Sequence, residues 1–240
     1  MTRAAVARAA GATFLLYIAV KVASAILFEG SIGSGAAAGR LAAVAAHAGD
    51  LRIATVLALG NCVCALVMAV LLYFYTRGSH PELSTLILVS RTGEAVLFGV
   101  FALGMIALVY IATNSTPASG DTDAALVVAI IRSTRHATLV ASFFFAIGST
   151  VFAWVLLRAR LAPRSLAALG LLGSLVPIVG MPLQIIGATR GFNTGLLWVL
   201  MFLFEIVLGV WLLATGGRDP QAGAWRRPLV RINLSGSSGR

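Results

Sequence analysis

Charged side chains are scarce in this sequence: Asp, Glu, Lys and Arg make up 11% of its 240 residues, against about 25% in soluble globular domains. Lysine occurs once, as Lys21. The two cysteines, Cys62 and Cys64, are too few to complete a metal site. The three histidines lie far apart, and the chain has no H-E-x-x-H, G-x-S-x-G or phosphate-loop motif. We therefore predict no catalytic residue, no metal site and no cofactor.

Apolar residues fill the chain instead. Hydrophobic residues make up 59% of the sequence and the mean hydropathy is +0.96, which is typical of a polytopic membrane protein. Spans of about 20 residues each with short connections use up the chain and leave no room for a soluble catalytic domain. We predict an all-α membrane bundle of six transmembrane helices in a single domain, residues 1–217. The expected spans are 11–28, 52–76, 83–111, 137–157, 166–188 and 192–214.

The first apolar run has one alternative interpretation. Ala23-Ser24-Ala25 resembles the cleavage site of a signal peptide, but Lys21 interrupts the apolar core that such a peptide needs. We therefore interpret the run as the first span.

The connecting segments carry their own signals. Residues 30–50, rich in Gly, Ala and Ser, predict an extracytoplasmic loop with a short helix near 36–48. In the fifth span, Gly170 and Ser174 form a small-xxx-small pair suited to close helix packing, and Pro177 and Pro182 predict a kink. Residues 218–240 form a basic tail, and its last part, 235–240, resembles an engineered linker.

Arginine placement predicts the orientation of the bundle. With both termini cytoplasmic, most arginines fall on the cytoplasmic side, as the positive-inside rule requires. Seventeen of the 18 basic residues are Arg, which indicates a GC-rich bacterial genome and hence the bacterial cytoplasmic membrane. The net charge of +10 is then topological: the tail arginines attract anionic lipid headgroups, and no nucleic acid partner is required. The cytoplasmic set is Arg3, Arg8, Arg77, Arg158, Arg160, Arg164, Arg218, Arg226, Arg227 and Arg231.

A few charged residues fall within the predicted spans. At about 1.5 Å per helical residue, Glu94, Glu205 and Lys21 lie roughly 17, 18 and 15 Å from the starts of their helices, near the middle of the membrane. Arg91 shares the face of Glu94 one turn away, and Asn61 falls near the same level. We expect spans one, three and six to converge at these residues.

This constellation has two interpretations. Two carboxylates and two cations are formally neutral together, so they can form a structural ion-pair network that fixes which helices adjoin. Ionisable residues inside a membrane also mark sites for ions, protons or polar ligands. Near the outer surface, Arg132, Arg135 and His136 form either a basic vestibule or a helix end whose side chains snorkel to water.

Three functions follow from these interpretations. The favoured one is binding or transport of a small polar or ionic ligand, or of a proton, within the bundle. The alternative is a non-catalytic interaction or regulatory protein whose buried ion pairs are only structural. A membrane-embedded enzyme has less support, because only the carboxylate pair offers acid and base chemistry.

Several short segments carry a family resemblance. They are Leu51-Arg52-Ile53, Arg91-Thr92-Gly93-Glu94-Ala95, residues 143–149 (FFFAIGS), residues 160–174 (RLAPRSLAALGLLGS) and residues 205–213 (EIVLGVWLL). In this order they resemble an uncharacterised bacterial integral membrane family, the domain of unknown function 4386. The resemblance implies a multi-span membrane protein and supplies no activity, substrate or site residue.

Overall fold

The computed structural model describes residues 2–188 and 196–217, and all regular secondary structure within these ranges is helical. Six of the helices are long and apolar enough to cross a membrane, which confirms the predicted all-α bundle with six spans. The helices are α1 (Arg3–Ser31), α2 (Ala37–Ala46), α3 (Ala48–Thr76), α4 (Pro81–Asn114), α5 (Gly120–Arg158), α6 (Arg164–Ile185) and α7 (Leu196–Thr215).

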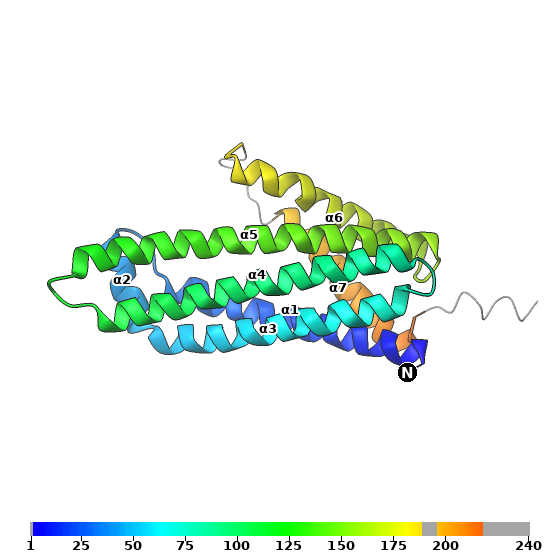
Figure 1. Ribbon diagram of the computed structural model, residues 1–240, viewed down its shortest axis with the longest axis horizontal. Coiled ribbons are helices and arrows are strands. Elements are labelled where there is room, and N and C mark those ends of the chain that lie inside the picture. The colour runs from blue at the N-terminus through cyan, green and yellow to red at the C-terminus, as the bar shows by residue number, and fades with distance from the viewer. Residues whose placement is uncertain (1, 189–195, 218–240) are drawn as a thin grey trace, which may run out of the picture.

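The six long helices form a closed ring in which each packs mainly on two neighbours, in the order α1, α3, α4, α5, α6, α7 and back to α1. Within the described ranges, the backbone of α1 does not contact that of α4 or α5, and the backbones of α4 and α7 are not in contact either. The short helix α2 covers one end of the ring against α4 and α5 (Figure 1). Side chains from α1, α4, α5 and α7 therefore meet in the interior of the ring rather than through backbone contact.

The helix that contains the predicted fourth span, 137–157, extends well beyond it. It begins at Gly120, and its first turns continue to bury residues at helical spacing, among them Ala124, Val127 and Ile131. These turns pack on α2 and α4 at the end of the bundle. The expected start of the last span at residue 192 and the basic tail 218–240 lie outside the described residues.

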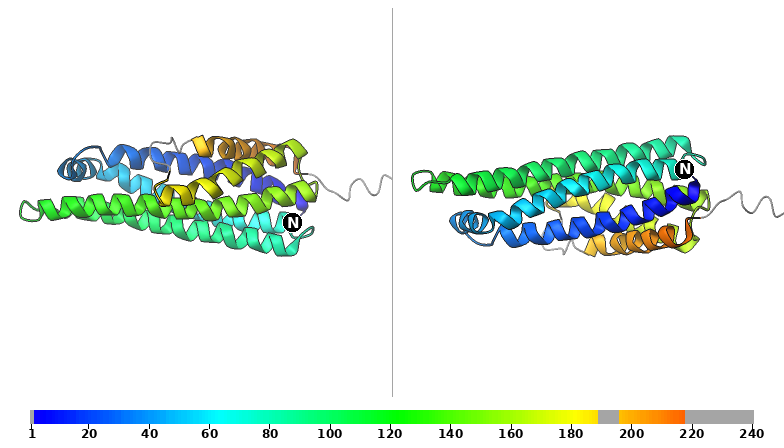
Figure 2. Two further views of the ribbon diagram at one scale, coloured as in Figure 1. Left: turned by 90° about the horizontal axis from the view of Figure 1, so that it is seen from above. Right: turned by 90° about the horizontal axis from the view of Figure 1, so that it is seen from below.

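The described chain ends lie together. Gly216, just beyond α7, is close enough to Ala4 that a side chain on the glycine would contact it, at 3.1 Å. Figure 2 shows the start of α1 and the end of α7 at the same end of the bundle. This agrees with an even number of membrane crossings. Which side of the membrane the two chain ends face stays a prediction.

Small residues bring neighbouring helices together, because the lipid supplies little hydrophobic drive for helix association. A Cβ atom on Gly11 of α1 would lie 2.5 Å from the carbonyl oxygen of Gly209 on α7. On α6, a Cβ on Gly170 would lie 2.4 Å from the Phe204 ring, and the hydroxyl of Ser174 lies 2.8 Å from that of Thr150 on α5. Both members of the small-xxx-small pair thus face other helices.

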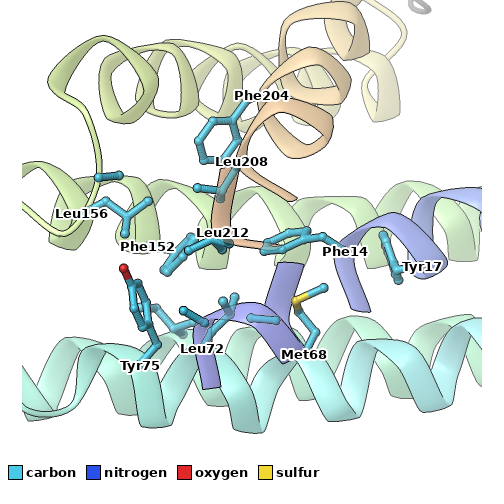
Figure 3. Close-up of a cluster of buried hydrophobic side chains, with 14 of the residues drawn as sticks. Phe14, Tyr17, Met68, Leu72, Tyr75, Phe152, Leu156, Phe204, Leu208 and Leu212 are labelled. Atoms are coloured by element: carbon cyan, nitrogen blue, oxygen red, sulfur yellow. The ribbon is translucent and has the colours of Figure 1, made fainter. Parts of the chain in front are cut away.

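The interior is apolar at both ends, and the charged residues lie between the two apolar clusters. The cluster at the end with the chain termini draws on all six long helices and includes Phe14, Met68, Leu72 and Phe152 (Figure 3). The other cluster surrounds Phe101 near α2. Large apolar residues also cover the outside, such as Ile26, Val56 and Leu103 at 67%, 68% and 65% exposed, as expected for a surface that contacts lipid.

Candidate functional site

Arg91 of α4 lies at the centre of the charged constellation and is 2% exposed. Its Nη1 lies 3.0 Å from Oε2 of Glu94, one turn along the same helix. Its Nη2 lies 3.5 Å from Oε1 of Glu205 on α7 and 3.2 Å from the hydroxyl of Ser149 on α5. One guanidinium group therefore links three helices that surround the interior of the ring.

The position of Arg91 depends on close packing of α4 against α5. A side chain on Gly148 of α5 would lie 3.1 Å from Cβ of Ser90 and 3.6 Å from Cγ of Arg91. One turn earlier on α5, the Phe145 ring lies 4.4 Å from the Arg91 guanidinium carbon, within the range of a cation–π interaction. This packing holds the guanidinium group in one place.

Tyr17 of α1 joins Lys21 to this cluster. Its hydroxyl donates a hydrogen bond to Oε1 of Glu94, and Nζ of Lys21 donates to the same hydroxyl at 3.2 Å. Glu94, fully buried, thus uses one carboxylate oxygen for Arg91 and the other for Tyr17. The structure brings Lys21, Arg91, Glu94 and Glu205 into one connected network, with spans one, three and six meeting there.

Sequence reasoning missed Tyr17. The available signal is its position one helical turn before Lys21, on the same face of the span. A tyrosine in an apolar span is ordinary as a core residue, whereas its hydroxyl needs a partner when it is buried. Tyr17 is 1% exposed, so the buried hydroxyl and the buried carboxylate of Glu94 satisfy each other.

Lys21 sits among aromatic rings rather than beside a carboxylate. Its ammonium nitrogen lies 5.0 Å from the Phe98 ring centre, 5.2 Å from Phe145, 5.3 Å from Tyr17 and 5.8 Å from Trp198. No carboxylate of the described chain lies within salt-bridge distance of it. An ammonium group has three N–H donors, and the hydroxyl of Tyr17 takes one of them. Lys21 therefore keeps unused donors.

Two cavities adjoin Lys21. The first, of about 240 Å³, lies between α1, α3, α4 and α5, with Asn61, Phe98 and Phe101 in its wall and Arg135 at its far end. The second, of about 300 Å³, lies between α1, α5 and α7 and includes Trp198 and Glu205. Lys21, Ala25 and Thr138 line both cavities. Both cavities are lined by residues of α1 and α5, whose backbones are not in contact.

Asn61 of α3 is the side chain of this site whose polar atoms are all unpaired in the described part of the chain. It is 2% exposed, and neither its amide nitrogen nor its amide oxygen has a hydrogen-bond partner within the described chain. Asn61 lines the first cavity together with Lys21. The two side chains therefore present free N–H donors and one free acceptor oxygen to the same cavity. Arg91 keeps only its Nε–H without a partner among the described residues, and both of its Nη atoms are paired, whereas neither amide atom of Asn61 is.

The three residues predicted as an outer vestibule are only partly together. Nη2 of Arg135 lies 2.6 Å from Oε2 of Glu29, joining α5 to α1, and both side chains are about half exposed. Arg132 lines a neighbouring hollow of about 320 Å³ with Arg40 and Arg135. His136 is exposed. Only Arg135 of the three reaches the first cavity.

The described residues contain no group of three or more His, Cys, Asp or Glu side chains that could hold a metal ion. The chemistry offered is that of hydrogen bonds and charge: an ammonium group, an amide, aromatic faces and a carboxylate bordering two cavities. Such a set can bind and orient a ligand.

The fold and this buried network define a multi-pass membrane protein built around an interior charged site. The sequence model of the family described as domain of unknown function DUF4386 matches residues 9–216. The chain belongs to this family, as its short segments indicated. No curated protein and no solved structure matches it.

Proposed function

We propose that this protein binds a small polar or ionic ligand inside its helix bundle, in the cavities beside Lys21 and Asn61. The observation that carries the proposal is Asn61, which is buried, unpaired among the described residues and set in the wall of a cavity. A buried polar group without a hydrogen bond costs about 1–3 kcal/mol. A ligand in the cavity would supply the missing partners.

Lys21 supports the same location. A cation within a membrane span costs roughly 2.5–3.5 kcal/mol on insertion scales, and such residues mark ion or ligand paths. The neighbours of Lys21 offset only part of this cost, through one hydrogen bond and several aromatic ring faces. An acceptor group on a ligand would use the remaining donors.

The paired half of the constellation has a different role in this proposal. Arg91, Glu94 and Glu205 form a framework that fixes Tyr17, and through Tyr17 the position of Lys21. Glu205 also borders the second cavity, so a ligand there would lie next to the framework. A protein that releases the ligand on the other side of the membrane would be a transporter, and one that does not would be a receptor or regulator.

The first experiment asks whether the site can be reached. Lys21 supplies the only lysine side-chain amine of the chain, so acetylation by a small neutral reagent, read by mass spectrometry, reports on it alone. In protein held in phosphatidylcholine nanodiscs we expect Lys21 to react, and we expect the Asn61→Phe variant, which fills the first cavity, to react more slowly. The matched control is Asn114→Phe, at an exposed position.

The second experiment measures binding. The midpoint of thermal unfolding is recorded with benzoate, choline, glycine betaine and glycerol, since a ligand that binds only the folded state raises it. The proposal expects at least one of these probes to raise the midpoint in the wild type and not in Asn61→Leu. If none does, and Lys21 reacts only after denaturation, the site is dry and the proposal fails.

One observation favours the competing function, a purely structural network. The contacts of Arg91 with Glu94 and Glu205 are buried, and Lys21, joined to them through Tyr17, completes the formal charge balance without a ligand. In that case the cavities beside Lys21 would be packing defects. The structural function would be supported if the Glu94→Gln and Glu205→Gln variants, each reconstituted in liposomes, carried proton and ligand flux equal to that of the wild type.

A further inference from the structure

We propose that the ligand is a small organic carboxylate with an apolar body, its carboxylate held by Lys21 and Asn61 and its body in the first cavity. The inference rests on the proposed function and adds the chemical class of the ligand.

The unpaired groups select the head of the ligand. Arg91 already contacts two carboxylates, whereas the ammonium group of Lys21 contacts none in the described part of the chain. A carboxylate oxygen accepts strong hydrogen bonds from an ammonium group. The second carboxylate oxygen would accept from the amide nitrogen of Asn61, which has no other partner among the described residues. A cationic head would instead meet Lys21 as a like charge.

The wall of the first cavity selects the body of the ligand. Between Lys21 at one end and the Glu29–Arg135 pair at the other, its wall includes the rings of Phe28, Phe98 and Phe101. Ligand sites with apolar walls and a few fixed polar groups bind molecules that are themselves apolar with one polar end. A ligand polar along its whole length would leave its other polar groups unpaired against these rings.

The charge at the far end of the cavity favours an anion. The hollow beside it is lined by Arg40, Arg132 and Arg135, and Glu29 pairs with one of these arginines. A cluster of one charge sign raises the local concentration of ligands of the opposite sign. Two of the three predicted vestibule residues, Arg132 and Arg135, thereby gain a role as an attracting surface.

The test uses three probes that share one alkyl chain and differ in the head: octanoate, octanol and octyltrimethylammonium. Each competes with the acetylation of Lys21 in nanodiscs of zwitterionic phosphatidylcholine. We expect octanoate to slow the reaction by at least about tenfold and the other two to change it little. Octanol enters the bilayer without bearing a charge, so it controls for partition into the membrane.

Two variants test whether octanoate protects Lys21 by binding in the first cavity. Asn61→Leu should still react at Lys21 but lose the protection by octanoate, whereas the exposed control Asn114→Leu should keep it. Equal protection by octanol and octanoate, or stronger protection by octyltrimethylammonium, overturns the carboxylate class while leaving a ligand site in place. If Lys21 does not react in the folded protein and no probe of either experiment binds, the proposed function falls as well.

Discussion

The hydroxyl of Tyr17 on α1 donates a hydrogen bond to Glu94 on α4, although the backbones of these two helices are not in contact in the described structure. The bond therefore crosses the interior of the ring. It also ties the paired side of the constellation, at Arg91, to the unpaired side, at Lys21. Tyr17 is thus the residue that connects the ion pairs of Arg91 to Lys21.

Replacing Tyr17 by Phe tests this dependence. The change removes one hydroxyl and leaves Oε1 of Glu94 and Nζ of Lys21 without the bond each makes to it. We expect the free energy of unfolding to fall by about 1–3 kcal/mol, measured by titration with SDS. The same change at Tyr110, which is 69% exposed, should have little effect. A Tyr17→Phe protein as stable as the wild type would show that the bond contributes nothing.

The ion pairs of Arg91 should differ in strength. Arg91→Met alone leaves two buried carboxylates without their cation and should cost about 3–5 kcal/mol. Adding Glu94→Gln should recover part of this loss, because the double change leaves less charge unpaired. A double-mutant cycle gives the coupling free energy, and we expect it to be larger for Glu94, at 3.0 Å, than for Glu205, at 3.5 Å.

The pair of Glu29 and Arg135 provides the exposed comparison. Both side chains are about half exposed, and such pairs contribute about 0–1 kcal/mol. We expect Glu29→Gln to change the free energy of unfolding by less than that, and added salt to reduce the difference further. A coupling as large as that of Arg91 with Glu94 would mean that this pair is shielded from water.

The convergence of the charged residues was the property that the sequence predicted well. Arg91, Glu94, Glu205 and Lys21 each interrupt an apolar run, and the constant rise of a helix converts residue number into depth. Burial of charge then requires partners, so their convergence could be expected. The six spans followed from hydropathy in the same way.

Rotation of the helices about their axes was not predictable in this way. The sequence cannot show that Tyr17 points at Glu94, or that α1 and α5 leave cavities beside Lys21 and Asn61, since both depend on which helices adjoin in the ring. The length of α5 was not predictable either, because hydropathy marks the part expected inside lipid and not the part that continues as a helix against α2.

Two glycine substitutions should have opposite effects. A Cβ on Gly11 would lie 2.5 Å from the Gly209 carbonyl oxygen and 2.6 Å from the Leu213 nitrogen, both backbone atoms. Gly11→Ala must therefore push α1 and α7 apart and should cost about 1–3 kcal/mol. Gly99 on α4 has open space around its Cβ position, so Gly99→Ala should be neutral or stabilise by up to about 1 kcal/mol. Unfolding in SDS measures both, and a loss at Gly99 as large as at Gly11 would contradict this packing.

The orientation of the bundle predicts which loops can be reached from outside the cell. Cysteines are introduced singly at Gly78 and at Ala118, exposed positions in the α3–α4 and α4–α5 connections. The background carries Cys62→Ala and Cys64→Ala. The α3–α4 connection follows Arg77 and should be cytoplasmic under the positive-inside rule, whereas the other connection holds no arginine. We expect a membrane-impermeant maleimide to label Ala118→Cys in intact cells and to label Gly78→Cys only after permeabilisation. The reverse pattern would place both chain ends outside and would turn the arginines beside the first cavity, Arg132 and Arg135, toward the cytoplasm, so that an organic anion would be drawn from the cell interior.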